Sequence, residues 1–267
     1  MGINPAGWQE KLIIKLKERG IIASLFYSGD FLLLQFPENE QLIIHLLPVH
    51  HHFEPEVLLE LQQAYRLKEV QLIQLWEDIG LTREEQILSR LTGLLGRNKK
   101  IHGRKTKIIA ISQAQADQFL NLYHLQGSAK ARDKYALTLD NEMIAVATFS
   151  AKRKMTREKE GYTSVELIRF ATKDGITVQG GLSKLIKHLI RESGPNDVMT
   201  YADLDWSYGK GYAKLGFTLT EQTAPAEIYL DTQQLIRYFP HRLPADIPPD
   251  RLVRIFNMGN LKYILYL

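Results

Sequence analysis

The chain has 267 residues, of which 45% are hydrophobic and 24% charged, the composition of a globular protein rather than a disordered or fibrous one. It contains no cysteine, which excludes disulfides, thiolate zinc sites and cysteine nucleophiles. No apolar run approaches the roughly 20 residues that span a bilayer, and the first residues lack the order of a signal peptide, so we expect a cytoplasmic protein with no membrane partner.

The net charge of +4 is unevenly distributed. From Gln86 to Ala116 there is no acidic residue, and this window holds seven basic ones: Arg90, Arg97, Lys99, Lys100, Arg104, Lys105 and Lys107. A second basic group follows later: Lys152, Arg153, Lys154 and Arg157. Such clusters fit a polyanion such as DNA, and a solvated linker with a charged helix end is the alternative.

The first part of the chain, residues 1–108, predicts an α/β domain with the order αβββαβα. Helices are expected at 7–20, 55–67 and 81–96, and strands at 21–26, 31–36, 41–47 and 70–76. Pro55 occupies a helix-initiating position, and Thr82 with Glu85 has the spacing of a capping box. The basic stretch 97–107 is predicted to be a connector.

The second part, residues 109–267, predicts a mixed sheet with helices. Ser112 opens a helix that ends near Gly127, and Asp140 with Asn141 joins two strands in a hairpin. Further strands are expected at 164–172, 197–205 and 226–231, with helices at 181–193 and 207–217. The last residues, 252–267, predict a terminal hairpin that turns at Gly259.

A diglycine, Gly180 and Gly181, stands between the strand at 164–172 and the amphipathic helix at 181–193. The first amides of a helix are unpaired and carry partial positive charge, so they bind anions readily. A plain turn is the alternative. The predicted anion site comprises Gln179, Gly180, Gly181, Leu182, Ser183 and Lys184.

Residues 110–267 resemble the Gcn5-related N-acetyltransferase (GNAT) superfamily, and within it the phage and mobile-element branch that includes the DNA-modification protein Mom and domains fused to endonucleases. The matching pieces include 121–127 (NLYHLQG), 166–170 (ELIRF), 180–184 (GGLSK), 201–203 (YAD) and 254–263 (RIFNMGNLKY). The longer glycine signature of the family is shortened here to Gln179-Gly180-Gly181. The resemblance implies a GNAT-like sheet, and acetyl-coenzyme A or a related acyl-coenzyme A as cofactor at the diglycine turn.

The resemblance also implies four catalytic candidates. Glu166 stands where several acetyltransferases keep a general base, and Tyr212 where the family often has an acid for the leaving thiolate. An ion pair with Arg169 or Arg153 is the alternative for Glu166, and hydrophobic packing is the alternative for Tyr212.

His124 and Asp203 are the other two candidates, from elements that resemble the Mom-like branch. For His124 the alternative is a structural histidine. For Asp203 it is a cap on the helix expected at 207–217.

Residues 1–108 weakly resemble the restriction-endonuclease-like fold of Vsr-type nucleases. Asp30 is in place for one acidic metal ligand, but the strand at 41–47 offers neither an acid nor a lysine, so we expect a degenerate domain without nuclease activity. The run His50, His51, His52 is interpreted as a polar loop, and we expect no metal site.

These features support three hypotheses. The first is an acyltransferase, or a transferase of an acyl-derived group, that modifies DNA bases and contacts DNA through Arg97, Lys99, Lys100, Arg104, Lys105 and Lys107. The second is a catalytically inactive DNA-binding or assembly module. The third is an acetyltransferase for a small amine or protein.

Overall fold

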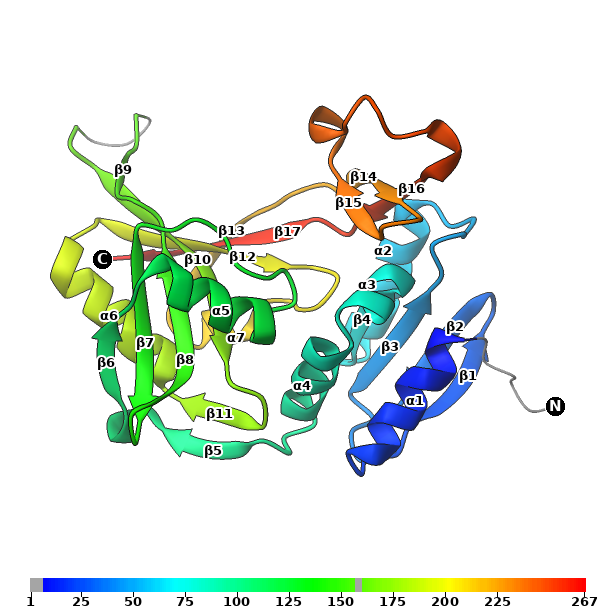
Figure 1. Cartoon of the computed structure of the whole chain (residues 1–267), viewed down its shortest axis with the longest axis horizontal. Helices are drawn as coiled ribbons and strands as arrows, with labels where there is room; N and C mark the ends of the chain where they lie inside the picture. The colour runs from blue at the N-terminus through cyan, green and yellow to red at the C-terminus, as the bar shows by residue number, and fades with distance from the viewer. Residues whose placement is uncertain (1–6, 157–159) are drawn as a thin grey trace. The chain divides into compact units, whose positions relative to one another are not determined.

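A computed structural model describes residues 7–156 and 160–267 (Figure 1). They form two compact units. The first contains the chain up to Glu84 together with Ala202–Lys210 and Glu221–Leu261, and the second contains Glu85–Tyr201, Gly211–Thr220 and Lys262–Leu267. A single boundary at residue 108 does not describe these units, and the assignment of 109–267 to one domain stays a prediction. No helix of the described chain is long and apolar enough to cross a membrane.

The first unit is built on a four-stranded sheet with the order β1-β2-β3-β4. Its strands are β1 (Ser24–Ser28), β2 (Phe31–Gln35), β3 (Leu42–Leu47) and β4 (Gln71–Trp76), preceded by α1 (Trp8–Glu18). β3 and β4 are parallel because α2 (Pro55–Leu67) carries the chain between them. The predicted order αβββαβ is confirmed.

The helix expected at 81–96 is two helices, α3 (Glu77–Thr82) and α4 (Glu84–Leu94). The predicted capping box is wrong, because Thr82 ends α3 and its hydroxyl donates to the carbonyl oxygen of Asp78 at 2.7 Å. Because α4 begins at Glu84, Arg83 rather than Thr82 occupies the N-cap position, and Thr82 lies inside the last turn of α3.

The predicted terminal hairpin is also wrong. β16 (Leu252–Asn257) belongs to a small sheet with β14 (Ala226–Asp231) and β15 (Ile236–Tyr238), whereas β17 (Asn260–Tyr266) joins a larger sheet. Gly259, between them, has φ 85°, and a Cβ atom there would lie 2.3 Å from the carbonyl oxygen of Thr223. The glycine therefore serves a close backbone approach rather than a hairpin turn. Two short 3₁₀ helices, η2 (Pro240–Arg242) and η3 (Pro249–Arg251), lie between β15 and β16.

An eight-stranded sheet (Figure 1), most of which lies in the second unit, has the order β13-β17-β12-β10-β8-β7-β6, and β9 pairs with β10. Its other strands are β6 (Lys107–Ala110), β7 (Asp133–Leu139), β8 (Glu142–Phe149), β9 (Arg153–Lys154), β10 (Thr163–Thr172), β12 (Asp197–Asp203) and β13 (Thr218–Gln222). The hairpin between β7 and β8 is confirmed, since Asp140 and Asn141 both have positive φ, 51° and 65°.

Two helices cover opposite faces of this sheet. α5 (Gln113–Tyr123) packs Phe119 and Leu120 on Ala136, Val146 and Ala171. α6 (Gly181–Ser193) packs on the other face, since its His188 contacts the Tyr135 ring and its Gly181 approaches Leu137. These two residues of β7 flank Ala136 and therefore point away from α5. Ser112 caps α5 in a capping box with Gln115, as predicted for the start of that helix.

The basic stretch is folded, which corrects the prediction of a connector. Lys99–His102 form β5, which pairs in parallel with β11 (Ile176–Gln179), and Gly103–Lys105 form a 3₁₀ turn, η1. By contrast, the helix expected at 207–217 contracts to α7 (Lys210–Ala213).

Candidate functional site

Two neighbouring parallel strands of the large sheet separate after a short paired stretch. β10 pairs with β12 only from Ser164 to Glu166. Beyond this point β10 bends, with a bulge against β8 between Leu167 and Arg169, and the hydroxyl of Thr200 donates to the carbonyl oxygen of Leu167 at 3.0 Å. The divergence leaves one edge of β10 outside the β10–β12 ladder.

The diglycine turn begins α6, and a glycine is required at each of its two positions for a different structural reason. Gly180 is left-handed, with φ 71°, and a Cβ atom built on it meets nothing within 4 Å. Gly181 is buried, and a Cβ atom there would lie 2.8 Å from Val178 and 2.9 Å from Leu137. Gly180 therefore supplies the turn and keeps its outer side open, whereas Gly181 allows α6 to pack on the sheet.

The first amides of α6 are open. In the chain as described, no hydrogen bond is recorded from the backbone amides of Gly181, Leu182 or Ser183, and the first helical bond runs from the Lys184 amide to the Gly180 carbonyl oxygen at 3.0 Å. Gln179 and Gly180 are exposed beside them. These three donors and the positive end of the helix fit an anion such as a diphosphate.

Lys184 does not add its charge to this turn. Its ammonium group donates to the carbonyl oxygen of Gly103 at 3.0 Å and to that of Thr106. The side chain thus fastens η1 to α6, and the prediction that Lys184 contacts a phosphate loses its structural basis.

All six residues of the predicted nucleic-acid segment, Arg97, Lys99, Lys100, Arg104, Lys105 and Lys107, are exposed. The segment packs closely on the diglycine turn. A Cβ atom built on Gly103 would lie 3.1 Å from the Gln179 carbonyl oxygen and 3.2 Å from the Gly180 carbonyl carbon. Of the second basic group, Arg157 lies outside the described residues, and Lys152, Arg153 and Lys154 are exposed.

The bulge in β10 brings Glu166 and Arg169 to one face of the sheet. Arg169 lies opposite Thr148, on the α5 side, and Leu167 lies opposite Phe149, on the other side. Glu166, next to Leu167, therefore points to the α5 side as well. No hydrogen bond or ion pair of the Glu166 carboxylate is recorded within the described chain, so the alternative of an ion pair with Arg169 or Arg153 has no support there.

His124 ends α5 and is held neutral. Its Nδ1 accepts the Gln126 amide at 3.1 Å, so the proton of the neutral ring lies on Nε2. Burial lowers the pKa of His124 to about 3, with further lowering by the positive charges of Arg169 and Arg90. In this tautomer Nε2 carries the proton, so the ring can donate a hydrogen bond from Nε2 but is poorly suited to act as a general base.

The other two catalytic candidates remain predictions. The Tyr212 ring packs on Phe217 and Tyr263, each with ring centroids 5.7 Å apart, which favours the packing alternative. Asp203 lies in the first unit, where its carboxylate accepts the Asp205 amide at 3.0 Å and its carbonyl oxygen accepts the Ser207 amide at 2.9 Å. Asp203 thus shapes the turn after β12.

The first unit contains a buried polar core. Asp30 is exposed in the β1–β2 turn, so it is not on a strand. His45 of β3 is buried and donates from Nδ1 to the Gln74 amide oxygen at 2.6 Å, and burial lowers its pKa to about 4. His51 packs its ring on Trp76 and Phe256. No cluster of three or more potential metal ligands is present among the described residues.

Asp78 and Asp205 are the buried acids of this core. Arg237 binds Asp78 through two bonds of 2.6 and 2.7 Å. Asp205 accepts the Met258 amide at 3.0 Å, and burial, followed by the charge of Asp203, raises the pKa of Asp205 well above its usual value. Neither acid was predicted from the sequence, because only the tertiary fold brings 78, 205, 237 and 258 together.

Comparison with known proteins shows similarity at the level of structure only. No family model matches the chain, and no curated protein matches it in sequence. Similar solved structures include the Bacillus subtilis acetyltransferase in complex with CoA (16% identity, TM-score 0.35) and a GNAT family acetyltransferase from Elizabethkingia anophelis with acetyl-CoA bound (14%, 0.36), each over 61% of this chain and 99% of the other. The ribosomal-protein-S18-alanine N-acetyltransferase of Escherichia coli aligns over 60% of this chain and 93% of its own (16%, 0.33). Similarities this low do not assign an activity to the chain.

Proposed function

We propose that the second unit binds an acyl-coenzyme A and transfers its acyl group to an amine. The observation that carries this proposal is that three backbone amides at the start of α6 make no hydrogen bond within the described chain. The chain reaches α6 from the end of β10 that no longer pairs with β12. A diphosphate needs several donors at one point, and the open outer side of Gly180 leaves room for it. Gly181, Leu182 and Ser183 would hold the diphosphate through their amides.

The chemistry of the cofactor is that of a thioester, which presents its carbonyl carbon for attack by an amine. Glu166 accepts the proton that the attacking amine loses, since its carboxylate is half-buried and faces the α5 side with no recorded partner in the described chain. His124, at the end of α5, would donate a hydrogen bond from Nε2 to the bound substrate on the same side of β10. The proposed acid, Tyr212, would return a proton to the leaving sulfur.

The first test uses a pair of isosteric variants at the start of α6. Ser183→Asp places a negative charge in the first helical turn, where it favours the helix but repels a diphosphate, whereas Ser183→Asn has nearly the same shape without the charge. We expect calorimetry to show acetyl-coenzyme A binding that weakens about tenfold or more in Ser183→Asp and little in Ser183→Asn, from a loss of about 1.5–3 kcal/mol. Equal affinities in the two variants, or no binding to the unchanged protein, would refute the cofactor site.

The second test concerns the proposed general base. Glu166→Gln keeps the size of the side chain but cannot take a proton, so we expect the rate of acyl transfer to fall about 10²-fold or more while acetyl-coenzyme A still binds. Transfer rates are measured with a panel of amines and with DNA as acceptors. A variant with an unchanged transfer rate would exclude Glu166 as the base.

The finer proposal is that the acceptor is a DNA base, as in the Mom-like branch, and that the first unit is a degenerate nuclease-like domain. The exposed basic segment held on the diglycine turn supports DNA as a partner. Mass spectrometry of DNA exposed to the protein in cells tests this acceptor. The same basic segment favours the second candidate, an inactive DNA-binding module, which predicts DNA binding without any effect of coenzyme A.

A further inference from the structure

β12 has an open face on the α5 side of the large sheet. Met199 of β12 is the partner of Glu166 in the parallel ladder with β10, so the two side chains point to the same side. Tyr201 follows Met199 on that face by alternation. Burial has the same period, because Val198 and Thr200 are buried whereas Met199 is half-buried and Tyr201 is exposed.

Tyr201 is an exposed aromatic residue on an interior strand. β12 lies between β10 and β17 in the sheet, yet 41% of Tyr201 is exposed. The core cluster under α5 includes Ala136, Val146 and Ala171, from β7, β8 and the far end of β10, and no residue of β12. Among the described residues, no ring contact or hydrogen bond of the Tyr201 side chain is recorded. One face of a large aromatic ring is therefore available to a ligand.

The neighbours of Tyr201 define what this ligand is. Glu166 is half-buried, and no partner of its carboxylate is recorded in the described chain. It lies beside Met199, and Tyr201 lies two residues, about 6.6 Å, further along β12. A thioether and an aromatic ring both pack well on a flat ring, and a carboxylate accepts hydrogen bonds from an amino group. A flat ring with an amino group on its edge fits this arrangement.

We propose that Tyr201 and Met199 form a stacking platform for an unpaired nucleobase, whose exocyclic amine is directed to Glu166. Every base has a flat face that stacks on an aromatic side chain. A base inside a duplex has its face covered and its amine paired, so the platform takes a base that is single-stranded or flipped out. The inference rests on the proposed function only in that Glu166 is the base of the transfer reaction, since stacking requires no acyl-coenzyme A.

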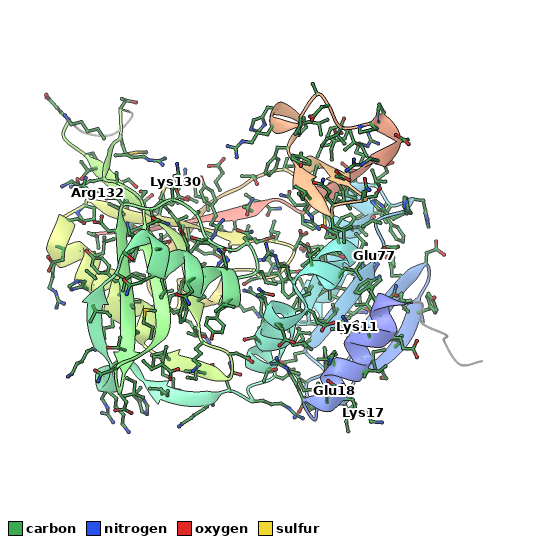
Figure 2. The ribbon with its side chains drawn as sticks, in the orientation of Figure 1. Lys11, Lys17, Glu18, Glu77, Lys130 and Arg132 are labelled. Atoms are coloured by element: carbon green, nitrogen blue, oxygen red, sulfur yellow. The ribbon has the colours of Figure 1, made fainter. Side chains whose placement is uncertain are left out.

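The charges beside α5 favour a nucleotide over a simple cation. The segment that follows α5 is fastened to that helix, because the Ser128 amide donates to Asn121 Oδ1 at 2.9 Å. Lys130 and Arg132, on the same segment (Figure 2), are exposed. Their positive charges attract the phosphates next to a base. They repel an aliphatic ammonium group, which is the other ligand that binds an aromatic face.

The test uses nuclear magnetic resonance of the methionine methyl groups in the full-length protein. A base stacked on the platform shifts the Met199 methyl resonance through its ring current, whereas Met143, packed on the α5 core, serves as the internal reference. A cytosine oligodeoxynucleotide, a thymine oligodeoxynucleotide of equal length and spermidine are titrated separately.

We expect the cytosine oligodeoxynucleotide to shift Met199 saturably, at a concentration about threefold or more below that of the thymine one, which has no exocyclic amine. Spermidine should leave Met199 unmoved, and Met143 should not respond to any of the three. Glu166→Gln should narrow the preference for cytosine, because it removes the charged acceptor of the amine.

Matched tyrosine variants then assign the platform. Tyr201→Leu removes the aromatic face and should weaken the affinity for the cytosine oligodeoxynucleotide about tenfold. Tyr201→Phe keeps the ring and should retain most of the affinity. Tyr266→Leu is the control, since Tyr266 is an exposed tyrosine of β17 in the same unit, and it should change the affinity less than about twofold.

Three results would overturn the proposal: a Met199 resonance that does not move with the cytosine oligodeoxynucleotide, one that moves as readily with spermidine, or equal weakening by Tyr201→Leu and Tyr266→Leu. Calorimetry with acetyl-coenzyme A and the Ser183 pair separates the two proposals. Stacking that depends on Tyr201, in a protein that ignores acetyl-coenzyme A, supports the platform and refutes the cofactor site. Acetyl-coenzyme A binding that depends on residue 183, with an unmoved Met199, does the reverse.

Discussion

At the scale of single residues, two histidines show how strongly the surroundings decide a role. His45 and His124 are both kept neutral by burial, but His45 is fully buried whereas His124 is half-buried. His45 therefore acts as a packing residue with one hydrogen bond, to Gln74. His124 retains a donor that can meet a ligand.

His45 gives a prediction on stability. Because its pKa is lowered from 6.5 to about 4 in the folded state, the neutral ring stabilises the fold fully above pH 6.5, and this contribution is lost as pH falls from 6.5 toward 4. The loss is on the order of 3 kcal/mol. Urea unfolding at several pH values should show a shallower pH dependence in His45→Asn than in the unchanged protein.

His52→Asn is the control for that experiment, since His52 is exposed in the loop before α2. It should keep the pH dependence of the unchanged protein. Identical pH profiles for His45→Asn and His52→Asn would contradict the role assigned to His45.

At the scale of elements, α6 and the segments packed on it form the part of the site that depends most on close contacts. β5 pairs with β11, Lys184 bonds to the carbonyl oxygens of η1, and Gly181 sits against Val178. The diglycine turn is thus supported from two sides while Gly180 stays open to solvent. This arrangement keeps the first amides of α6 in place without covering them.

The two glycines should respond differently to substitution. Gly181→Ala forces a methyl group against Val178 and Leu137, so we expect the free energy of unfolding to fall by about 1–3 kcal/mol. Gly180→Ala meets no atom but must hold φ 71°, which costs about 1–2 kcal/mol. Chemical denaturation measures both.

Coenzyme binding separates the glycines further. The added methyl group of Gly180→Ala stands on the open side of the turn, so this variant should also weaken acetyl-coenzyme A binding, whereas Gly181→Ala should act mainly on stability. An unchanged stability in Gly181→Ala would show that α6 does not pack on the sheet as described.

At the scale of the whole molecule, charge is the feature that bears on partners. The six exposed basic residues of 97–107 lie on an ordered segment of the second unit, joined to β11, rather than on a free linker. An ordered row of charges presents a defined surface to a phosphate backbone.

This surface predicts salt-dependent DNA binding. The double variant Lys99→Gln/Lys100→Gln should reduce the slope of the logarithm of the DNA-binding constant against the logarithm of the salt concentration by about 2. About one counterion is released for each lysine–phosphate contact. Fluorescence anisotropy at several salt concentrations measures the slope. The control is Lys11→Gln with Lys17→Gln, two exposed lysines of α1 (Figure 2); a similar loss of slope in this control would show that the binding is not specific to the segment.

The sequence by itself determined the local elements. The apolar spacing of 181–193, the Ser112 cap and the Asp140-Asn141 turn each act within a few residues, so α6, α5 and the β7–β8 hairpin agree with their predictions. The diglycine was recognised for the same reason, since a helix start is a local feature.

Only the tertiary structure decided which distant groups meet. Glu166 and Arg169 are three residues apart, which in a regular strand places them on opposite faces, and the bulge that turns both to the α5 side depends on pairing with β8. Arg90 was visible in the sequence only as a charge, and its electrostatic effect on His124 arises in a fold that brings α4 against the end of α5. Likewise β16 and β17 read as one hairpin but enter different sheets, because strand pairing is set by hydrogen-bond partners far along the chain and not by the residues of the turn.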